Sequence, residues 1–172
     1  MQLTDEFLKD FSDEHLVYEI NSLYSLLAIK IEPKDAWWVS IQNAVLESMT
    51  IHARVLYEFL YVDNQKRTDD CSAAHFFENS SIWPSRRIKP SNELIRVGTR
   101  VGKEIVHLTY SRKSDPFEKA WNLRDTTAEI LLNLKLFVKY GDPKKIGGNV
   151  GPAIEHWSKL SGLNNVLKKL KI

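Results

Sequence analysis

The stretch 35-DAWWVSIQNAVLESMTIHARVLYEFLYV-62 decides the fold class, because its apolar residues recur at the spacing of an α-helix. At about 100° per residue, one set of them falls within about 40° of a single direction: Trp38, Ile41, Val45, Met49, Leu56 and Phe59. Pro33 precedes this pattern and a polar cluster, NQKRTDD, follows it. The pattern therefore predicts a helix from about Asp35 to Val62 that buries one face.

Three further segments have the same helical period. We expect a first helix that is capped by Ser12 and a third that runs from about Ser91 to Arg112. The fourth segment has Asp115 as a predicted N-cap, a capping box completed at Glu118, and an end near Tyr140. The apolar positions of the first and third helices are Leu16, Ile20, Leu23 and Leu27, and Leu94, Val97, Val101, Ile105 and Leu108.

These segments predict an all-α four-helix bundle with short accessory helices. CSAAHFF at 71–77 is expected to form a short helical turn, and the proline- and serine-containing stretch 78–92 a loop. We assign residues 1–143 to the bundle domain and 144–172 to a glycine-containing, mobile connector with a C-terminal amphipathic helix. The lysine-rich tail could pack on its own domain or on that of a second copy, or bind a membrane surface or a partner groove.

Composition bounds the class of protein. The chain has 172 residues, 43% of them hydrophobic, and a net charge of +2, which is compatible with one domain and neither requires nor excludes nucleic acid. Cys71 is the single cysteine, so an intrachain disulfide is excluded. The acidic N-terminus does not resemble a signal peptide, and no apolar run is long enough to span a membrane. We expect a soluble protein of the cytoplasm.

The third predicted helix carries a polar stripe beside its apolar face. On continuous α-helical geometry, Arg96, Arg100, Glu104, His107 and Ser111 fall on one side of it. Arg100 and His107 are seven residues apart and would lie two turns apart on nearly one line. One interpretation is a site for an anionic substrate. The alternative is a solvated helix edge on which Arg100 and Glu104 form an ion pair.

An arginine followed, after six residues, by a histidine on a late helix of a small all-α domain resembles the signature of the HEPN superfamily. The resemblance implies a metal-independent endoribonuclease of a toxin–antitoxin or phage-defence system, or an inactive relative that binds RNA or protein. It also implies a homodimer, no cofactor, RNA as substrate and an antitoxin-like protein as partner. Carried over, Arg100 would contact phosphate, His107 would transfer the proton, Arg96 would assist with phosphate and Glu104 would hold an arginine in place.

The residue types suit this chemistry. A ribose 2′-hydroxyl can attack the adjacent phosphorus without a metal if a base removes its proton and a cation stabilises the charged phosphorus centre. Histidine titrates near neutral pH, and arginine stays charged and donates two parallel hydrogen bonds to phosphate. The competing class is a non-enzymatic interaction protein in which the stripe and the tail are contact surfaces.

A basic loop precedes the third helix. Arg86, Arg87 and Lys89 lie close to Trp83, and a basic loop with an aromatic ring can hold a single nucleic acid strand by stacking. Arg86 and Arg87 are therefore candidate substrate-binding residues. The alternative is an ordinary loop in which Trp83 closes one end of the core.

His52 falls in the middle of the apolar stripe of the second helix, where a histidine needs a hydrogen-bond partner. We interpret it as a core histidine with such a partner rather than as a catalytic one. Arg54 and Glu58, four residues apart, are expected to form a surface ion pair.

Asp69, Asp70 and His75 form the last candidate constellation. Two carboxylates and a histidine could bind a divalent cation, especially with Glu58 or Glu78 nearby. The alternative, which we favour, is that the acidic pair caps a helical turn, so no metal ligand is assigned.

Overall fold

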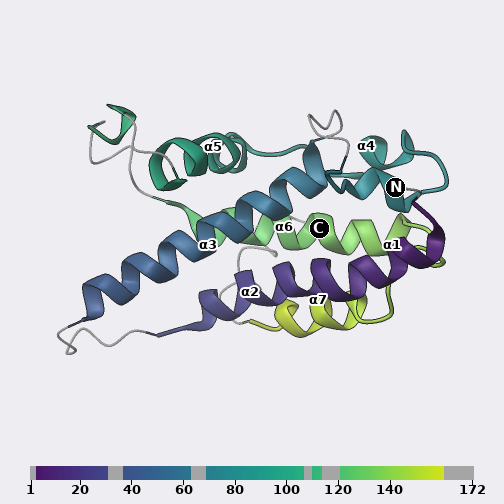
Figure 1. Ribbon diagram of the computed structural model, residues 1–172, viewed down its shortest axis with the longest axis horizontal. Coiled ribbons are helices and arrows are strands. Elements are labelled where there is room, and N and C mark those ends of the chain that lie inside the picture. Colours follow the sequence, from purple (N-terminus) through teal and green to yellow (C-terminus); the bar gives the residue numbers. More distant parts are fainter. Residues whose placement is uncertain (1–2, 31–36, 63–68, 107–109, 114–120, 161–172) are drawn as a thin grey trace.

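The computed structural model describes residues 3–30, 37–62, 69–106, 110–113 and 121–160 (Figure 1). Within these ranges every regular element is a helix and none is a strand, which confirms the all-α prediction. No helix in this part of the chain is both long and apolar enough to cross a membrane. The helices pack side by side, with α3 in contact with α2, α5 and α6, and with α7 against α2 and α6.

The first helical segment begins earlier than predicted. Helix α1 (Asp5–Phe11) is capped by Thr4, whose side-chain oxygen accepts the N–H of Phe7 at 3.1 Å. A π-helical turn, η1 (Ser12–Leu16), then leads directly into α2 (Val17–Ala28). The predicted cap at Ser12 was therefore wrong, because that buried hydroxyl lies inside the helical segment and donates to the carbonyl of Lys9.

Helix α3 (Trp38–Tyr61) forms within the predicted bounds and contributes Met49, Ala53 and Leu56 to the core. The N-terminal turns of α3 differ from the prediction. Ile41 belongs to the predicted apolar stripe but is 43% exposed, so the stripe is not buried in the core at this end of the helix. Figure 1 shows the reason: the first turns of α3 extend past the end of α2.

Two short helices follow. The helical turn expected at CSAAHFF is present as the 3₁₀ helix η2 (Ala73–Phe76), capped by Ser72. Helix α4 (Ile82–Arg86) lies in the stretch predicted as loop, and its Trp83 is fully buried. Trp83 packs with an aromatic cluster in which rings from α3, η2 and α6 meet mostly edge to face: Phe59, Phe76, Phe77 and Phe137.

The third predicted helix is not one continuous α-helix. Helix α5 (Asn92–Arg100) starts as expected at Ser91, whose hydroxyl accepts the N–H of Leu94 at 3.2 Å, but a π-helical segment, η3 (Val101–Val106), follows it. A 3₁₀ turn, η4 (Tyr110–Lys113), lies further along the chain. Glycine at 98 and 102 and β-branched side chains in η3 weaken regular α geometry here.

Helix α6 (Leu123–Tyr140) begins later than predicted. Its N-cap is Asn122, whose side-chain oxygen accepts the N–H of Asp125, and neither Trp121 nor Asn122 is helical. The predicted caps Asp115 and Glu118 lie outside the described residues. The predicted end at Tyr140 is confirmed, with Gly141 as the C-cap.

Helix α7 (Val150–Ser158) lies in the segment that we interpreted as a connector and tail. Val150 and Ile154 are buried, so this helix adds to the core rather than linking it to a separate part. The turn before α7 is held by η1: the hydroxyl of Ser12 accepts the N–H of Gly147 at 2.8 Å. The expected mobile connector is therefore a packed turn and helix, while the amphipathic tail from 161 onward lies outside the described residues.

Candidate functional site

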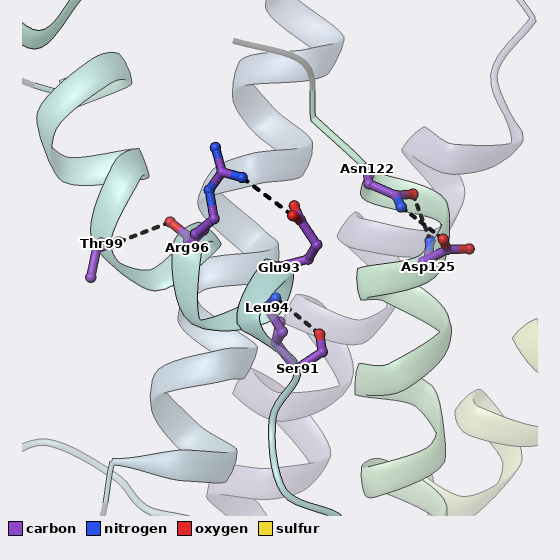
Figure 2. A network of polar contacts seen from close by, with 7 residues as sticks. All are labelled: Ser91, Glu93, Leu94, Arg96, Thr99, Asn122 and Asp125. Atoms are coloured by element: carbon purple, nitrogen blue, oxygen red, sulfur yellow. Dashed lines mark hydrogen bonds and ion pairs between the residues drawn. The ribbon is translucent and has the colours of Figure 1, made fainter. Parts of the chain in front are cut away.

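The predicted polar stripe begins on α5 with Arg96, which is exposed. Its guanidinium lies 3.3 Å from the carboxylate of Glu93, one turn earlier on the same helix. Figure 2 shows this pair beside the N-terminal turn of α6, where Asn122 and Asp125 are bonded to each other. Arg96 is therefore a surface cation held by a local ion pair.

Arg100 lies one turn further along α5 and is half-buried. Its guanidinium carbon is 4.3 Å from the centre of the Trp121 ring, just before α6 begins. Such a cation–π contact is worth about 0.5–1 kcal/mol or more. The contact restricts where this guanidinium group can lie.

The remaining predicted stripe residues are not tested by the structure. His107 lies outside the described residues, and so do the side chains of Glu104 and Ser111. The prediction that His107 lies on one line with Arg100 assumed continuous α-helical geometry. The structure has the π-helical η3 directly after Arg100, so the α-helical angle of about 100° per residue does not apply to the interval between the two.

The basic loop has a structural role at Trp83. The indole Nε1 donates to the carbonyl of Leu60 at 2.7 Å, and the guanidinium of Arg87 donates to the same oxygen at 2.8 Å. Arg87 also lies over the ring of Tyr61, at 5.4 Å. Of the two interpretations of Trp83, the closed core is confirmed, because a fully buried ring cannot stack on a nucleic acid base. Arg86 remains exposed, with its guanidinium 4.9 Å from the centre of the Tyr140 ring.

The interpretation of His52 as a histidine with a structural partner is confirmed. Its Nδ1 lies 2.7 Å from Oε2 of Glu19 on α2, and both side chains are mostly buried. The ring of Tyr18 meets the imidazole edge on. The expected ion pair between Arg54 and Glu58 is also present, at 2.8 Å.

The constellation around Asp69 and His75 does not form a metal site among the described residues, where no group of three histidine, cysteine or acidic side chains is placed to hold an ion. His75 instead serves η2: its Nδ1 accepts the N–H of Ser72 at 3.3 Å. Burial, and secondly the positive charge of Lys145, lower the pKa of His75. Both effects favour the neutral ring that this hydrogen bond requires.

A pocket of about 370 Å³ was not predicted from the sequence. It lies between η1 and its flanking turns, the C-terminal half of α3 and the segment before η2, and its lining is mostly apolar. The lining residues are Phe11, His15, Leu16, Glu19, Val55, Leu56, Glu58, Phe59, Asp70 and Cys71. Because these residues come from separate parts of the chain, no local motif marks the pocket.

The pocket combines apolar walls with hydrogen-bond acceptors. Glu19, Glu58 and Asp70 supply three carboxylates, and within the described part of the chain Asp70 makes no hydrogen bond or ion pair. Burial raises the pKa of the Cys71 thiol to about 12, so this thiol adds no charge to the pocket at physiological pH. An anionic ligand is disfavoured here, and an apolar group with an N–H or a positive charge is favoured.

Comparison of the chain with protein-family models, curated proteins and solved structures gave no match in any of the three.

Proposed function

We propose that this protein contacts RNA along the edge of α5 and acts there as a HEPN-like, metal-independent endoribonuclease. Arg96 and Arg100 would bind phosphate, and His107 would transfer the proton. The observation that carries the proposal is the position of Arg100, which is half-buried and has its guanidinium carbon 4.3 Å from the centre of the Trp121 ring. An arginine already held beside an aromatic ring loses less side-chain entropy when it binds a phosphate.

The spacing of the arginines also supports the proposal. Arg96 and Arg100 are four residues apart on α5, and like charges at this spacing destabilise a helix. The ion pair of Arg96 with Glu93 and the contact of Arg100 with Trp121 offset part of that repulsion. Neighbouring positive charges are what a phosphate-binding edge needs, so two arginines that stay together despite their repulsion support the proposal.

A π-helical segment follows Arg100 immediately. Such segments are rare, and they occur frequently at functional sites because they change the direction of the side chains that follow. The proposed His107 comes directly after η3 in the sequence.

In the proposed reaction, His107 removes the proton of the ribose 2′-hydroxyl, and the 2′-oxygen forms a bond to the adjacent phosphorus. Arg100 stabilises the negative charge on the phosphate oxygens. The bond to the 5′-oxygen of the next nucleotide breaks, and that oxygen takes up a proton from water or from the protonated His107. The products carry a 2′,3′-cyclic phosphate and a 5′-hydroxyl.

The test is cleavage of end-labelled total RNA by the purified protein in EDTA. Cutting should be abolished by both Arg100→Ala and His107→Ala, and the products should have cyclic phosphate ends. Lys139→Ala is the matched control, because it also removes one positive charge but lies in the last turn of α6, away from Trp121. Absence of cutting by the folded wild type would refute the enzymatic proposal. RNA binding that Arg100→Ala weakens would then leave an inactive RNA-binding module.

A second candidate function is that of a non-enzymatic interaction protein that acts through protein contacts, and it is favoured by a different observation. The start of α3 presents apolar side chains to solvent, with Trp37 at 73% and Ile41 at 43% exposure. Exposed apolar surface of this kind is typical of protein interaction sites. This second function leaves the chemistry of the partner open, whereas an antitoxin-like protein would be the partner of the enzyme proposed above.

A further inference from the structure

The outward face of α3 carries a regular seam. Positions 37, 41, 44, 48, 51 and 55 are separated alternately by four and three residues, which is the heptad spacing of helices that pair along their length. Most of these side chains are apolar, and all are exposed except the half-buried Ser48: Trp37, Ile41, Ala44, Ser48, Ile51 and Val55. We call this set the α3 seam.

The α3 seam faces away from the core. The buried positions of α3, such as Ala53, Leu56 and Leu60, lie on the opposite side of the helix, where α6 packs. In Figure 1, α3 crosses the molecule with α5 along one side and α2 along the other. The seam is therefore open between its neighbours and is not covered by any described part of the chain.

The surface around the start of the seam lacks charge. Residues 37–46, WWVSIQNAVL, contain no aspartate, glutamate, lysine, arginine or histidine, although most of them are exposed. About a quarter to a third of an ordinary solvated surface is charged. An exposed helical stretch without charge is therefore more typical of an interface core than of a surface in water.

The seam is compatible in size with a specific interface. Trp37, Ile41, Ile51 and Val55, with the adjacent Tyr18 of α2 at 60% exposure, present on the order of 500 Å² of apolar side chain. A symmetric pair of such faces would bury about 1,000 Å², near the lower limit for specific protein interfaces.

We propose that the α3 seam pairs with the same seam of a second copy, antiparallel, about a two-fold axis between positions 44 and 48. This arrangement pairs residues of compatible size along the whole seam. Ala44 of one copy meets Ser48 of the other, which allows close approach at the centre. Ile41 meets Ile51 on either side of the axis. The second copy is the occupant that the seam fits, because each position finds its match on the same surface.

The ends of the seam provide a further match. In this register Trp37 of one copy lies against Val55 of the other, and Val55 lines the 370 Å³ pocket. Trp37 is the most exposed apolar side chain of the seam and has an indole N–H to satisfy. The pocket has apolar walls and the carboxylates of Glu58 and Asp70. Each copy therefore inserts an indole into the pocket of the other.

The pairing does not depend on the proposed contact with RNA, because none of its residues belongs to the α5 edge. The two proposals can fail separately: cleavage tests the first, and association state tests the second. The first measurement is sedimentation equilibrium of the wild-type chain across micromolar concentrations. A reversible dimer is expected, and a strict monomer at these concentrations would overturn the proposal.

Two variants with opposite introduced charges test the antiparallel register of the seam. Ile41→Lys and Ile51→Glu should each weaken self-association about tenfold or more, because each places two charges in an apolar seam. Mixing the two variants should restore a heterodimer. In that heterodimer the introduced ammonium group faces the introduced carboxylate at one end of the seam, and the native isoleucine pair remains at the other. Lack of recovery on mixing would overturn the antiparallel register.

Val39→Lys is the matched control. Val39 is 52% exposed on the same helix but lies off the seam, so this variant should associate like the wild type. Equal weakening by Val39→Lys would show that association does not use the seam. Circular dichroism of every variant separates loss of pairing from loss of fold, and recovery on mixing requires both chains to be folded.

The pocket contact has its own test. Cys71 is the single cysteine and lines the pocket, so its rate of reaction with an organomercurial, which also attacks a protonated thiol, reports whether the pocket is covered. The reaction should be several-fold slower above the dimer dissociation constant than below it. Trp37→Ala should weaken the dimer and remove this difference in any dimer that remains. A reaction rate independent of concentration in the wild type would refute insertion of Trp37.

Discussion

The carboxylate of Asp13 in η1 accepts the backbone N–H of Asn149 at 2.7 Å, across 136 positions of the chain. Its other oxygen accepts the N–H of Gly148 at 3.1 Å. One side chain near the start of the chain thus satisfies two backbone donors at the beginning of α7, where helix N–H groups have no partner within the helix.

Removal of this carboxylate should loosen α7. Asp13→Ala is expected to lower the free energy of unfolding by about 1–3 kcal/mol, because it leaves the N–H groups of Gly148 and Asn149 without their charged acceptor. Asp13→Asn keeps one carbonyl acceptor and should lose less. Urea unfolding of the three proteins checks this order. Equal stability of Asp13→Ala and the wild type would contradict the assigned role.

Trp83 is expected to govern stability rather than nucleic acid binding. Trp83→Phe removes the hydrogen bond to the Leu60 carbonyl and leaves space in a closely packed aromatic cluster, at a cost of about 2 kcal/mol. Denaturant unfolding measures the loss. Arg86→Ala, at an exposed neighbour, should leave the unfolding midpoint nearly unchanged. An unfolding midpoint of Trp83→Phe equal to that of the wild type would contradict the stabilising role assigned to the indole.

The lowered pKa of His75 predicts how the stability of the protein depends on pH. Burial and Lys145 lower the pKa of the folded-state ring, so the unfolded state binds the proton more readily. The stability that His75 contributes is therefore fully present above the ordinary histidine pKa of about 6.5 and is lost as pH falls through the lower folded value. His75→Gln keeps an acceptor for the Ser72 N–H but does not titrate.

The corresponding measurement compares melting temperatures of the wild type and His75→Gln between about pH 8 and pH 5. The two proteins share every other titratable group, so only the difference between their curves reports His75. We expect the wild type to lose more stability than His75→Gln as pH falls below about 6.5. If the melting temperatures of the two proteins fell in parallel with pH, protonation of His75 would not be a cause of the lost stability.

Glu47 lies next to the proposed two-fold axis, on the flank of the α3 seam, and is exposed. In the antiparallel pair the two Glu47 side chains would approach each other and repel. Glu47→Gln should therefore tighten self-association by about two- to fivefold at low salt, and less at high salt. Sedimentation equilibrium at two salt concentrations checks this. If Glu47→Gln weakened the dimer instead, the two-fold axis would not lie between positions 44 and 48.

Much of the helical content follows from the sequence because it depends on local patterns. The period of α3, the cap at Ser91 and the stop at Gly141 each act within a few residues of themselves, and the structure has helix boundaries at those points. The expected partner of His52 was also a local inference, since a histidine on an apolar stripe needs one. That this partner is Glu19 of α2 could not be read from the spacing.

The caps of two helices differ from those that the sequence predicts. Helix α6 is capped by Asn122, after the non-helical Trp121 that lies against Arg100, and the predicted caps Asp115 and Glu118 lie outside the described residues. Ser12 also has the character of a cap, but its hydroxyl is used inside a longer helical segment and by Gly147. A capping residue shows that a helix can begin at its position, and packing selects among the possible starts.

The sequence by itself determined that the chain is helical, and it determined which arginines and histidines are candidates for chemistry. Only the tertiary structure decided that Trp83 is buried, that α7 belongs to the core and that Val55 and Cys71 share a pocket. The physical reason is distance along the chain. Helical period and caps depend on neighbours within one or two turns, whereas burial, pockets and exposed seams depend on which distant segments meet.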